Sequence, residues 1–331
     1  MAAKIEVRSF GGEYGALARM LAPSWEREHT SYLHFSKQQL RYLVQSPQVD
    51  RRWTLGCYRG KELLGFLLTL GKKVRMKSGR KVRVALNTLM TVKKGRERLL
   101  PHLHMLEYIA AHRGNAGYKF SLGFVDSKIS NNSILGAYLS HRYRYFKIIR
   151  TFPYFVRRLD LDDLASEPVL PEFFVSATVA KKERAACLRL VNAIKAKDFS
   201  EAWSARHFYP RLSGKHHFTF VAKKRRKVAG IFHGYIANMV SGPRAVKTAV
   251  VTTVSVDALN DAEKKAAIAE MMNGLRRRGV RQVIRGYMGI VSDSIWQESG
   301  FSRSFSSLNA YVCSDRRWPF RRPCKFAIEI I

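Results

Sequence analysis

The sequence predicts a mixed α/β protein made of two similar units in tandem. Signals for strands and helices alternate along the chain, which is typical of α/β architectures. The order of these signals over residues 4–160 recurs over residues 173–312. The length of 331 residues suits about two domains, and a hydrophobic content of 46% is enough to build their cores. We therefore expect domains at 1–160 and 172–331, each a central mixed twisted sheet flanked by helices, and a linker at 161–171.

The first half contains the elements of one such unit. Its expected helices carry apolar residues at helical spacing, and its expected strands are short runs bounded by turn residues. In chain order we expect a strand at 4–10, helices at 14–28 and 36–44, strands at 52–58 and 63–70, a basic hairpin tip at 72–83, a strand at 84–92, a helix at about 97–111, a strand at 119–125, a helix at about 131–141 and extended segments to 160. The acidic residues and prolines that follow give the linker.

The second half repeats this order. We expect a strand at 173–179, a helix at 182–194, strands at 217–221 and 228–236 on either side of a basic tip at 223–227, a strand at 248–256, a helix at 261–277, a strand at 282–286, a helix at 292–298 and a closing strand at 301–312. Two units with matching element order indicate an internal duplication whose sequences have diverged.

The charge of the chain is strongly unbalanced. The sequence has 59 Lys and Arg against 25 Asp and Glu, a formal net charge of +34. Residues 51–100 contain 15 basic against two acidic residues, and residues 201–250 contain ten against one. Repulsion of this size opposes compactness unless an anionic partner offsets it. This concentration predicts a docking surface for a large anion: nucleic acid, an anionic membrane surface, a phosphate-rich cofactor or an acidic carrier protein.

Cysteine and histidine patterns do not indicate a metal site. The four cysteines are widely spaced and form no CxxC pair, so neither a zinc ribbon nor a disulfide framework is expected. His216 and His217 are adjacent on an expected strand and point to opposite faces, so they cannot chelate one ion together. Residues 1–15 lack the long apolar run of a signal peptide, and no stretch has the roughly 18 apolar residues of a membrane span, so we expect a cytoplasmic protein of a reducing compartment.

A basic segment directly follows the strand at 84–92 and precedes a helix. Backbone N–H groups at a helix N-terminus, aided by Lys and Arg, form an anion site. The run Asn87–Val92 followed by Lys93 to Arg98 resembles the pyrophosphate loop of the GNAT (N-acetyltransferase) superfamily, and the corresponding segment of N-myristoyltransferases, which are two fused units of that fold. The superfamily's usual glycine-rich turn is reduced here to Gly95.

A second motif lies in the helix expected at 131–141. Asn131 and Tyr138 match the spacing of the superfamily's last helix, with Arg142 and Tyr143 in place of its Gly-Phe. The resemblance implies that Tyr138 protonates the departing thiolate, although an aromatic residue at this spacing also fits a core position. The residues that the resemblance assigns to donor binding are Leu89, Met90, Thr91, Val92, Lys93, Lys94, Gly95, Arg96, Arg98 and Asn131.

The second half lacks both features. Trp296 stands where the tyrosine is expected, and the loop at 257–261 is acidic. We therefore expect the active centre in the first half and a degenerate second unit that shapes the acceptor site. The candidate general base is Asp126, at the end of the strand at 119–125. The alternatives are Glu26, Glu28 and His29, which lie in the region that usually borders the acceptor.

The resemblance implies an N-acyltransferase (EC 2.3 class) that transfers an acyl group from a thioester to an amine by direct attack. The donor would be acyl-CoA or an acyl-phosphopantetheine on an acidic acyl carrier protein, with no metal. Two alternatives stay open. One is an aminoacyl-tRNA-dependent aminoacyltransferase on the same tandem fold. The other is a non-catalytic nucleic-acid-binding protein, whose affinity would fall steeply with salt. The sequence does not determine the oligomeric state.

Overall fold

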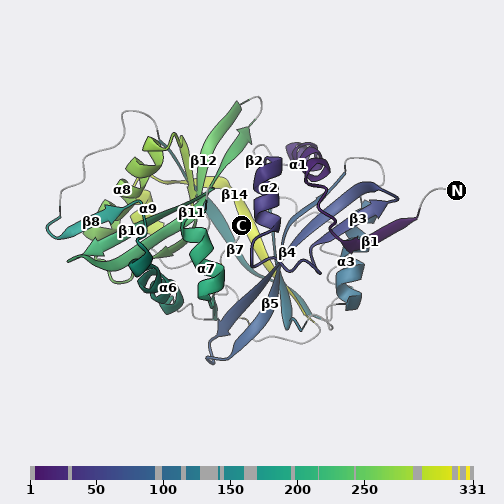
Figure 1. Cartoon of the computed structure of the whole chain (residues 1–331), viewed down its shortest axis with the longest axis horizontal. Helices are drawn as coiled ribbons and strands as arrows, with labels where there is room; N and C mark the ends of the chain where they lie inside the picture. Colours follow the sequence, from purple (N-terminus) through teal and green to yellow (C-terminus); the bar gives the residue numbers. More distant parts are fainter. Residues whose placement is uncertain are drawn as a thin grey trace.

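The computed structural model describes residues 4–28, 32–93, 99–112, 117–126, 141, 145–159, 170–194, 198–214, 216–241, 244–285, 293–314, 320 and 326–328. Within these ranges the chain forms one large mixed sheet with helices on both faces (Figure 1). The expected mixed α/β class is therefore confirmed.

In its described part the first half contains the other expected strands and helices, with one short strand in addition. Its elements are β1 (Ile5–Ser9), α1 (Tyr14–Glu28), β2 (Tyr32–His34), α2 (Lys37–Val44), β3 (Leu55–Arg59), β4 (Glu62–Met76), β5 (Lys81–Val92), α3 (Leu99–His112), β6 (Phe120–Asp126) and β7 (Tyr145–Arg158). Of the helix expected at 131–141 only His141 is described.

The second half follows the same order and completes the predicted repeat. Its elements are β8 (Phe173–Ser176), the 3₁₀ turn η2 (Lys181–Glu183), α6 (Arg184–Ala193), β9 (Phe199–Glu201), α7 (Ala205–Leu212), β10 (His217–Lys224), β11 (Lys227–Ser241), β12 (Arg244–Ser255), α8 (Asp261–Arg277), β13 (Gln282–Arg285), α9 (Asp293–Glu298), β14 (Ser302–Ser314) and β15 (Phe326–Ala327). The helix α7, absent from the sequence-based expectation, is the counterpart of α2, and the two helices have Ser204 and Ser36 at their N-cap positions.

The strand order of the sheet is symmetric about its centre, because corresponding strands of the two halves lie equally far from it on opposite sides. It runs β1-β3-β4-β5-β6-β14-β7-β13-β12-β11-β10-β8. Along this order each half has one parallel pair, β5–β6 or β12–β13, among antiparallel neighbours. This order confirms two tandem units of one fold.

The two halves exchange strands at their junction. β14 of the second half lies between β6 and β7 of the first, and β7 in turn pairs with β13 of the second half. A second exchange is reciprocal: β2 pairs with β11, and β9 pairs with β4. Every one of these contacts is a backbone ladder, so the junction is continuous sheet. The boundaries proposed at 160 and 172 stay a prediction, because residues 160–169 lie outside the described part.

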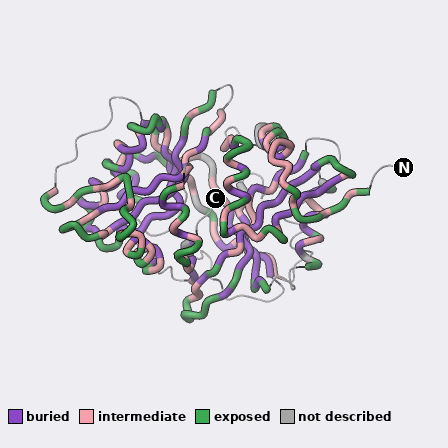
Figure 2. The backbone as a smooth tube through the Cα atoms, viewed as in Figure 1, coloured by how far each residue is buried: buried purple, intermediate pink, exposed green. Residues whose placement is uncertain are grey.

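Helices cover both faces of each half (Figure 2). In the first half α1 and α2 pack on one face, through side chains such as Leu17 and Leu40, and α3 packs on the other through Met105 and Ile109. In the second half α6 and α7 cover one face and α8 the other. Successive side chains of a strand point to opposite faces of the sheet. In the central strands both sets are buried, as expected for a sheet covered by helices on both sides.

One expected element is wrong. The sequence-based hairpin tip at 72–83 is mostly strand: β4 continues to Met76, β5 begins at Lys81, and only residues 77–80 form the turn. The run of Lys and Arg suggested an exposed tip. The alternation of strand side chains instead directs Lys72 inward, where it is buried, and Lys73 outward.

Candidate functional site

The two parallel strands of the first half separate at their C-terminal ends. β5 and β6 pair from Val84–Phe120 to Asn87–Gly123 and no further, although β5 runs on to Val92. We call residues 88–92 of β5 and 124–126 of β6 the first split. The carboxyl ends of parallel strands are where ligands of open α/β sheets bind.

A β-bulge lies in the first split. Opposite β4, Phe66 pairs with Thr91 and Leu68 with Thr88, so β5 carries one extra residue at this point. Leu89 within the bulge has a φ of +49°, a conformation that costs a non-glycine residue about 1–2 kcal/mol. A bulge leaves its extra residue unpaired and disrupts the hydrogen-bond ladder locally. The strain falls within the run that the resemblance assigns to donor binding.

Tyr311 from the second half closes the base of the first split. A Cβ on Gly123 would lie 2.1 Å from the phenol oxygen of Tyr311, so only glycine lets this side chain cross β6 at the last parallel pair. Tyr311 and Met90 both pack against the small buried cluster of Leu106 and Cys313. The first split is therefore built from both halves.

The helix α3 follows the first split and packs tightly on the sheet. A Cβ on Gly65 would lie 3.0–3.2 Å from side-chain atoms of Met105 and Pro101, so the glycine sets the approach of the helix. The first turn of α3 has no acidic residue. Lys93, just before it, forms an ion pair with Glu62, which lowers the pKa of the Glu62 carboxyl.

Part of the predicted site can be placed. Leu89, Thr91 and Val92 are buried and Met90 is half-buried in the first split, while Lys93 is exposed. The Thr91 hydroxyl has no hydrogen-bond partner within the described residues. Asp126 is the last residue of β6 and pairs through its backbone register with Leu308. The remaining predicted residues lie outside the described ranges and stay predictions: Lys94, Gly95, Arg96, Arg98, Asn131, Tyr138 and His29.

The equivalent position in the second half is filled by side chains. β12 and β13 pair up to Val251–Arg285 and β11–β12 has a bulge at the corresponding place. There the Arg285 guanidinium donates to Asp293 at 2.8 Å and lies 5.1 Å from the ring of Trp296, which is fully buried. Trp296 thus has a core role where the first half is expected to have a tyrosine.

The helix start of the second half is closed to anions. The Asn260 side chain accepts from the backbone N–H of Glu263, and the Glu263 carboxylate accepts from the backbone N–H of Asn260. Glu263 also pairs with Lys224 at 2.7 Å. A capping box satisfies the amides that an anion would need, and two carboxylates in the first turn repel it.

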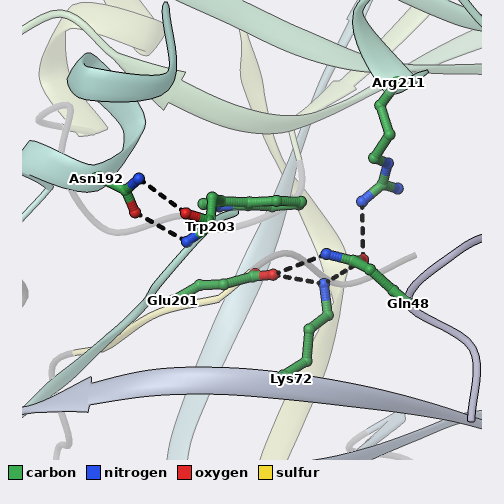
Figure 3. A network of polar contacts seen from close by, with 6 residues as sticks. All are labelled: Gln48, Lys72, Asn192, Glu201, Trp203 and Arg211. Carbon is green, nitrogen blue, oxygen red and sulfur yellow. Dashed lines mark hydrogen bonds and ion pairs between the residues drawn. The ribbon is translucent and has the colours of Figure 1, made fainter. Parts of the chain in front are cut away.

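A buried polar network, not expected from the sequence, joins the two halves (Figure 3). The Lys72 ammonium on β4 donates to Glu201 on β9 and to Gln48, each at 2.9 Å. Arg211 on α7 donates to the same Gln48 oxygen at 3.2 Å, and the Lys72 ammonium lies 4.9 Å from the centre of the Trp203 ring. The network places two cations beside one carboxylate, all of them buried.

Two titratable side chains near this network have shifted pKa values. Burial lowers the pKa of His207, and the charges of Arg206 and Lys72 lower it further. Burial raises the pKa of Tyr42, against the opposing effect of Arg211. One member of the network could have been found from the sequence. Lys72 follows Leu68 and Leu70 at two-residue spacing in β4, so its side chain is expected on the same buried face. Its partners come from distant segments and carried no such signal.

Among the described residues, no group of three or more His, Cys, Asp or Glu side chains is arranged to hold a metal ion. In the same ranges, no helix is both long and apolar enough to cross a membrane.

The chain superposes on solved structures of Saccharomyces cerevisiae N-myristoyltransferase. With the enzyme bound to myristoyl-CoA the TM-score is 0.74 at 12% identity, over 96% of this chain and 81% of that chain. Another structure, with myristoyl-CoA and inhibitors, gives 0.73 at 12% identity over 96% and 82%. A third, with bound myristoyl-CoA, gives 0.73 at 11% over 96% and 85%. The sequence matches no protein-family model and no curated protein. At this identity the likeness establishes the fold, the tandem GNAT fold expected from the sequence.

Proposed function

We propose that this protein is an N-acyltransferase that binds an acyl-CoA in the first half and transfers its acyl group to an amine. The observation that carries the proposal is the first split, a strained bulge at the carboxyl end of a parallel pair, in a fold shared with a myristoyl-CoA-binding enzyme. The second half supports it by contrast, since its equivalent position is filled and its helix start is capped.

The first split would hold the reacting thioester. Backbone N–H groups at Leu89–Val92 would donate to the carbonyl oxygen, where negative charge develops as the amine attacks. The bond from nitrogen to the acyl carbon forms and the carbon–sulfur bond breaks. Tyr138 would give its proton to the departing thiolate, and Asp126 would take the proton lost by the amine.

The donor's phosphates would lie at the start of α3. Arg96, Arg98 and the amides of 93–98 would hold them, aided by the dipole of α3 and by the absence of carboxylates in its first turn. Tyr311 crosses β6 at the base of the first split, so it would bound the space left for the acyl chain.

A second candidate donor is an aminoacyl-tRNA on the same fold. Exposed cations far from the first split favour it, since a CoA needs none of them. In that case the start of α3 would not be required for donor binding.

The test is calorimetric titration of the full chain with acetyl-CoA and with myristoyl-CoA. Arg96→Glu with Arg98→Glu should weaken binding of the preferred acyl-CoA at least tenfold, because charge reversal repels the phosphates. The matched control, Arg226→Glu with Lys227→Glu on an exposed turn of the second half, should leave binding within about twofold. Tyr138→Phe should bind acyl-CoA with normal affinity but turn over more slowly. Turnover is measured as thiol release, with glycinamide as the acceptor amine.

The proposal is contradicted if the chain binds neither acetyl-CoA nor myristoyl-CoA. It is also contradicted if the control variant loses as much affinity as the Arg96→Glu, Arg98→Glu variant. Unchanged turnover by Tyr138→Phe contradicts only the role of the phenol.

A further inference from the structure

The hairpin of β4 and β5 carries an array of cations on one face. In its register Lys73 lies opposite Arg83, and Arg75 lies opposite Lys81. Residues directly opposite each other in an antiparallel pair share a face, and so do residues two apart on one strand. Lys119 follows in the same row, where its N–H donates to the Arg83 carbonyl. We call these five residues the basic array.

Within the described residues, Lys73, Lys81 and Lys119 of the basic array form no ion pair, while Arg75 donates to the Asn192 carbonyl at 3.1 Å. The sequence has no Asp or Glu between Glu62 and Glu97. Asp50 lies 3.8 Å from the Arg83 guanidinium and also accepts from Tyr118 at 2.6 Å. Like charges directly opposite each other destabilise a strand pair by roughly 0.2–1 kcal/mol. The arrangement therefore opposes folding unless anions lie over it.

The duplicated hairpin provides an internal comparison. The parallel pairing aligns Val84 of β5 with Thr248 of β12, which fixes the matching positions in the other half. The four positions equivalent to the two opposed pairs hold Asn238, Val240, Ala245 and Lys247. The single cation, Lys247, donates to the Arg278 carbonyl at 2.6 Å. The fold itself therefore does not require a basic face on this hairpin.

The other basic turn of the chain is mostly compensated. Next to the β10–β11 turn, Lys223 pairs with Glu183 at 2.6 Å, Lys224 with Glu263 at 2.7 Å and Arg225 with Glu172 at 2.8 Å. If these cations served only solubility, we would expect both hairpins to leave their cations unpaired to the same degree. The β4–β5 hairpin differs in that Lys73, Lys81 and Arg83 are exposed on one face, and its turn adds the exposed Lys77 and Arg80.

We propose that the basic array, extended by Lys77 and Arg80, is a docking surface for RNA. Its rows are about 4.8 Å apart across strands and about 6.7 Å along them, which presents a regular set of cations to a backbone of regularly spaced phosphates. The cations lie side by side on one face of the hairpin. Double-stranded RNA is recognised largely through phosphates and 2′-hydroxyls across a wide, shallow minor groove, which a broad row of cations can follow.

The location and composition of the array disfavour other anionic partners. Arg83 lies roughly 25–30 Å along β5 from Val92, so a carrier protein that delivers a thioester to the first split would not cover it. A membrane-binding hairpin exposes apolar side chains for insertion. The large apolar side chains that are exposed in the described ranges are Leu100 and Phe174, and neither lies on this hairpin.

The test is binding of a fluorescent RNA stem-loop to the full chain, measured by anisotropy over a range of salt concentrations. Lys73→Gln, Lys77→Gln, Arg80→Gln and Lys81→Gln together remove four exposed charges whose side chains form no ion pair within the described part of the chain. We expect affinity to fall more than tenfold near 0.1 M salt and the salt slope to decrease by about three. Binding of acyl-CoA should be unchanged, which separates this inference from the proposed function.

The matched control removes four exposed charges from the second half: Arg226→Gln, Lys227→Gln, Arg244→Gln and Arg277→Gln. It should change RNA affinity less than threefold. Equal loss in the two variants means that net charge alone binds RNA, and overturns the proposal. It is also overturned if the native chain binds a DNA duplex of the same sequence more tightly than the RNA, or binds phosphatidylserine vesicles and not RNA.

Discussion

At the scale of single residues, loss of the Glu201 carboxylate should be costly. The carboxylate is buried, and it lies beside two buried cations, Lys72 directly and Arg211 through Gln48. Removing one partner of a buried ion pair leaves an uncompensated charge, which typically costs about 3–5 kcal/mol. The pair links β4 of one half to β9 of the other, so it also fixes how these strands meet.

We predict that Glu201→Gln lowers the free energy of unfolding by about 3 kcal/mol or more. The amide keeps the shape of the side chain but leaves Lys72 and Arg211 without the carboxylate. Lys72→Met removes one of the two cations, so the double variant should be more stable than Glu201→Gln alone. Urea denaturation of both single variants and the double variant gives the coupling energy. Strictly additive losses would show that the two side chains do not stabilise each other.

At the scale of elements, the capped helix α8 shows why some bounds were predictable. Its range, 261–277, was predicted in full, and so was that of α1, because apolar periodicity and local start signals lie within the segment itself. The expected tip at 72–83 was wrong because a run of cations gives no local sign of strand pairing. β2, β9 and α7 were missed, since the two short strands are stabilised by pairing with strands of the other half.

The cap of α8 also predicts a dependence on pH. The hydrogen bond from Lys224 holds the pKa of Glu263 below its ordinary value of 4.5, supported by the backbone N–H of Asn260. Because the folded pKa is below the unfolded one, this stabilisation is full above pH 4.5 and is lost as pH falls through the folded pKa. Glu263→Gln should therefore destabilise the chain by about 1 kcal/mol at pH 7 and hardly at all at pH 3.

The measurement is thermal unfolding at both pH values. Glutamine can still accept the hydrogen bond of the cap, so the variant isolates the charge. Asp261→Asn is the matched control in the same helical turn: its side chain is 73% exposed, and its loss should change stability less. A penalty for Glu263→Gln that is the same at pH 3 and pH 7 would contradict the role of the ion pair.

At the scale of the whole molecule, the candidate site could be predicted only where it is local. The bulge lies within the predicted run Leu89–Val92, which was identified from its place before a basic helix start. Tyr311 was missed because the sequence does not indicate that β14 lies beside β6. Strand exchange brings residues together that are almost 190 positions apart, as in the pairing of Gly123 with Tyr311. Neither propensity nor periodicity encodes such contacts.

Strand exchange further predicts how the molecule responds to cleavage between its halves. With a protease site inserted in 161–171, cleavage should leave the fragments associated, since β14–β6, β14–β7 and β13–β7 are backbone ladders and the Lys72–Glu201 pair is buried. Size-exclusion chromatography should give one peak of unchanged volume until urea unfolds the complex. Residues 1–160 expressed alone would lack β14 between β6 and β7 and expose two strand edges, so they should aggregate or show no cooperative unfolding. A monomeric 1–160 fragment that unfolds cooperatively would show instead that the first half completes its own sheet.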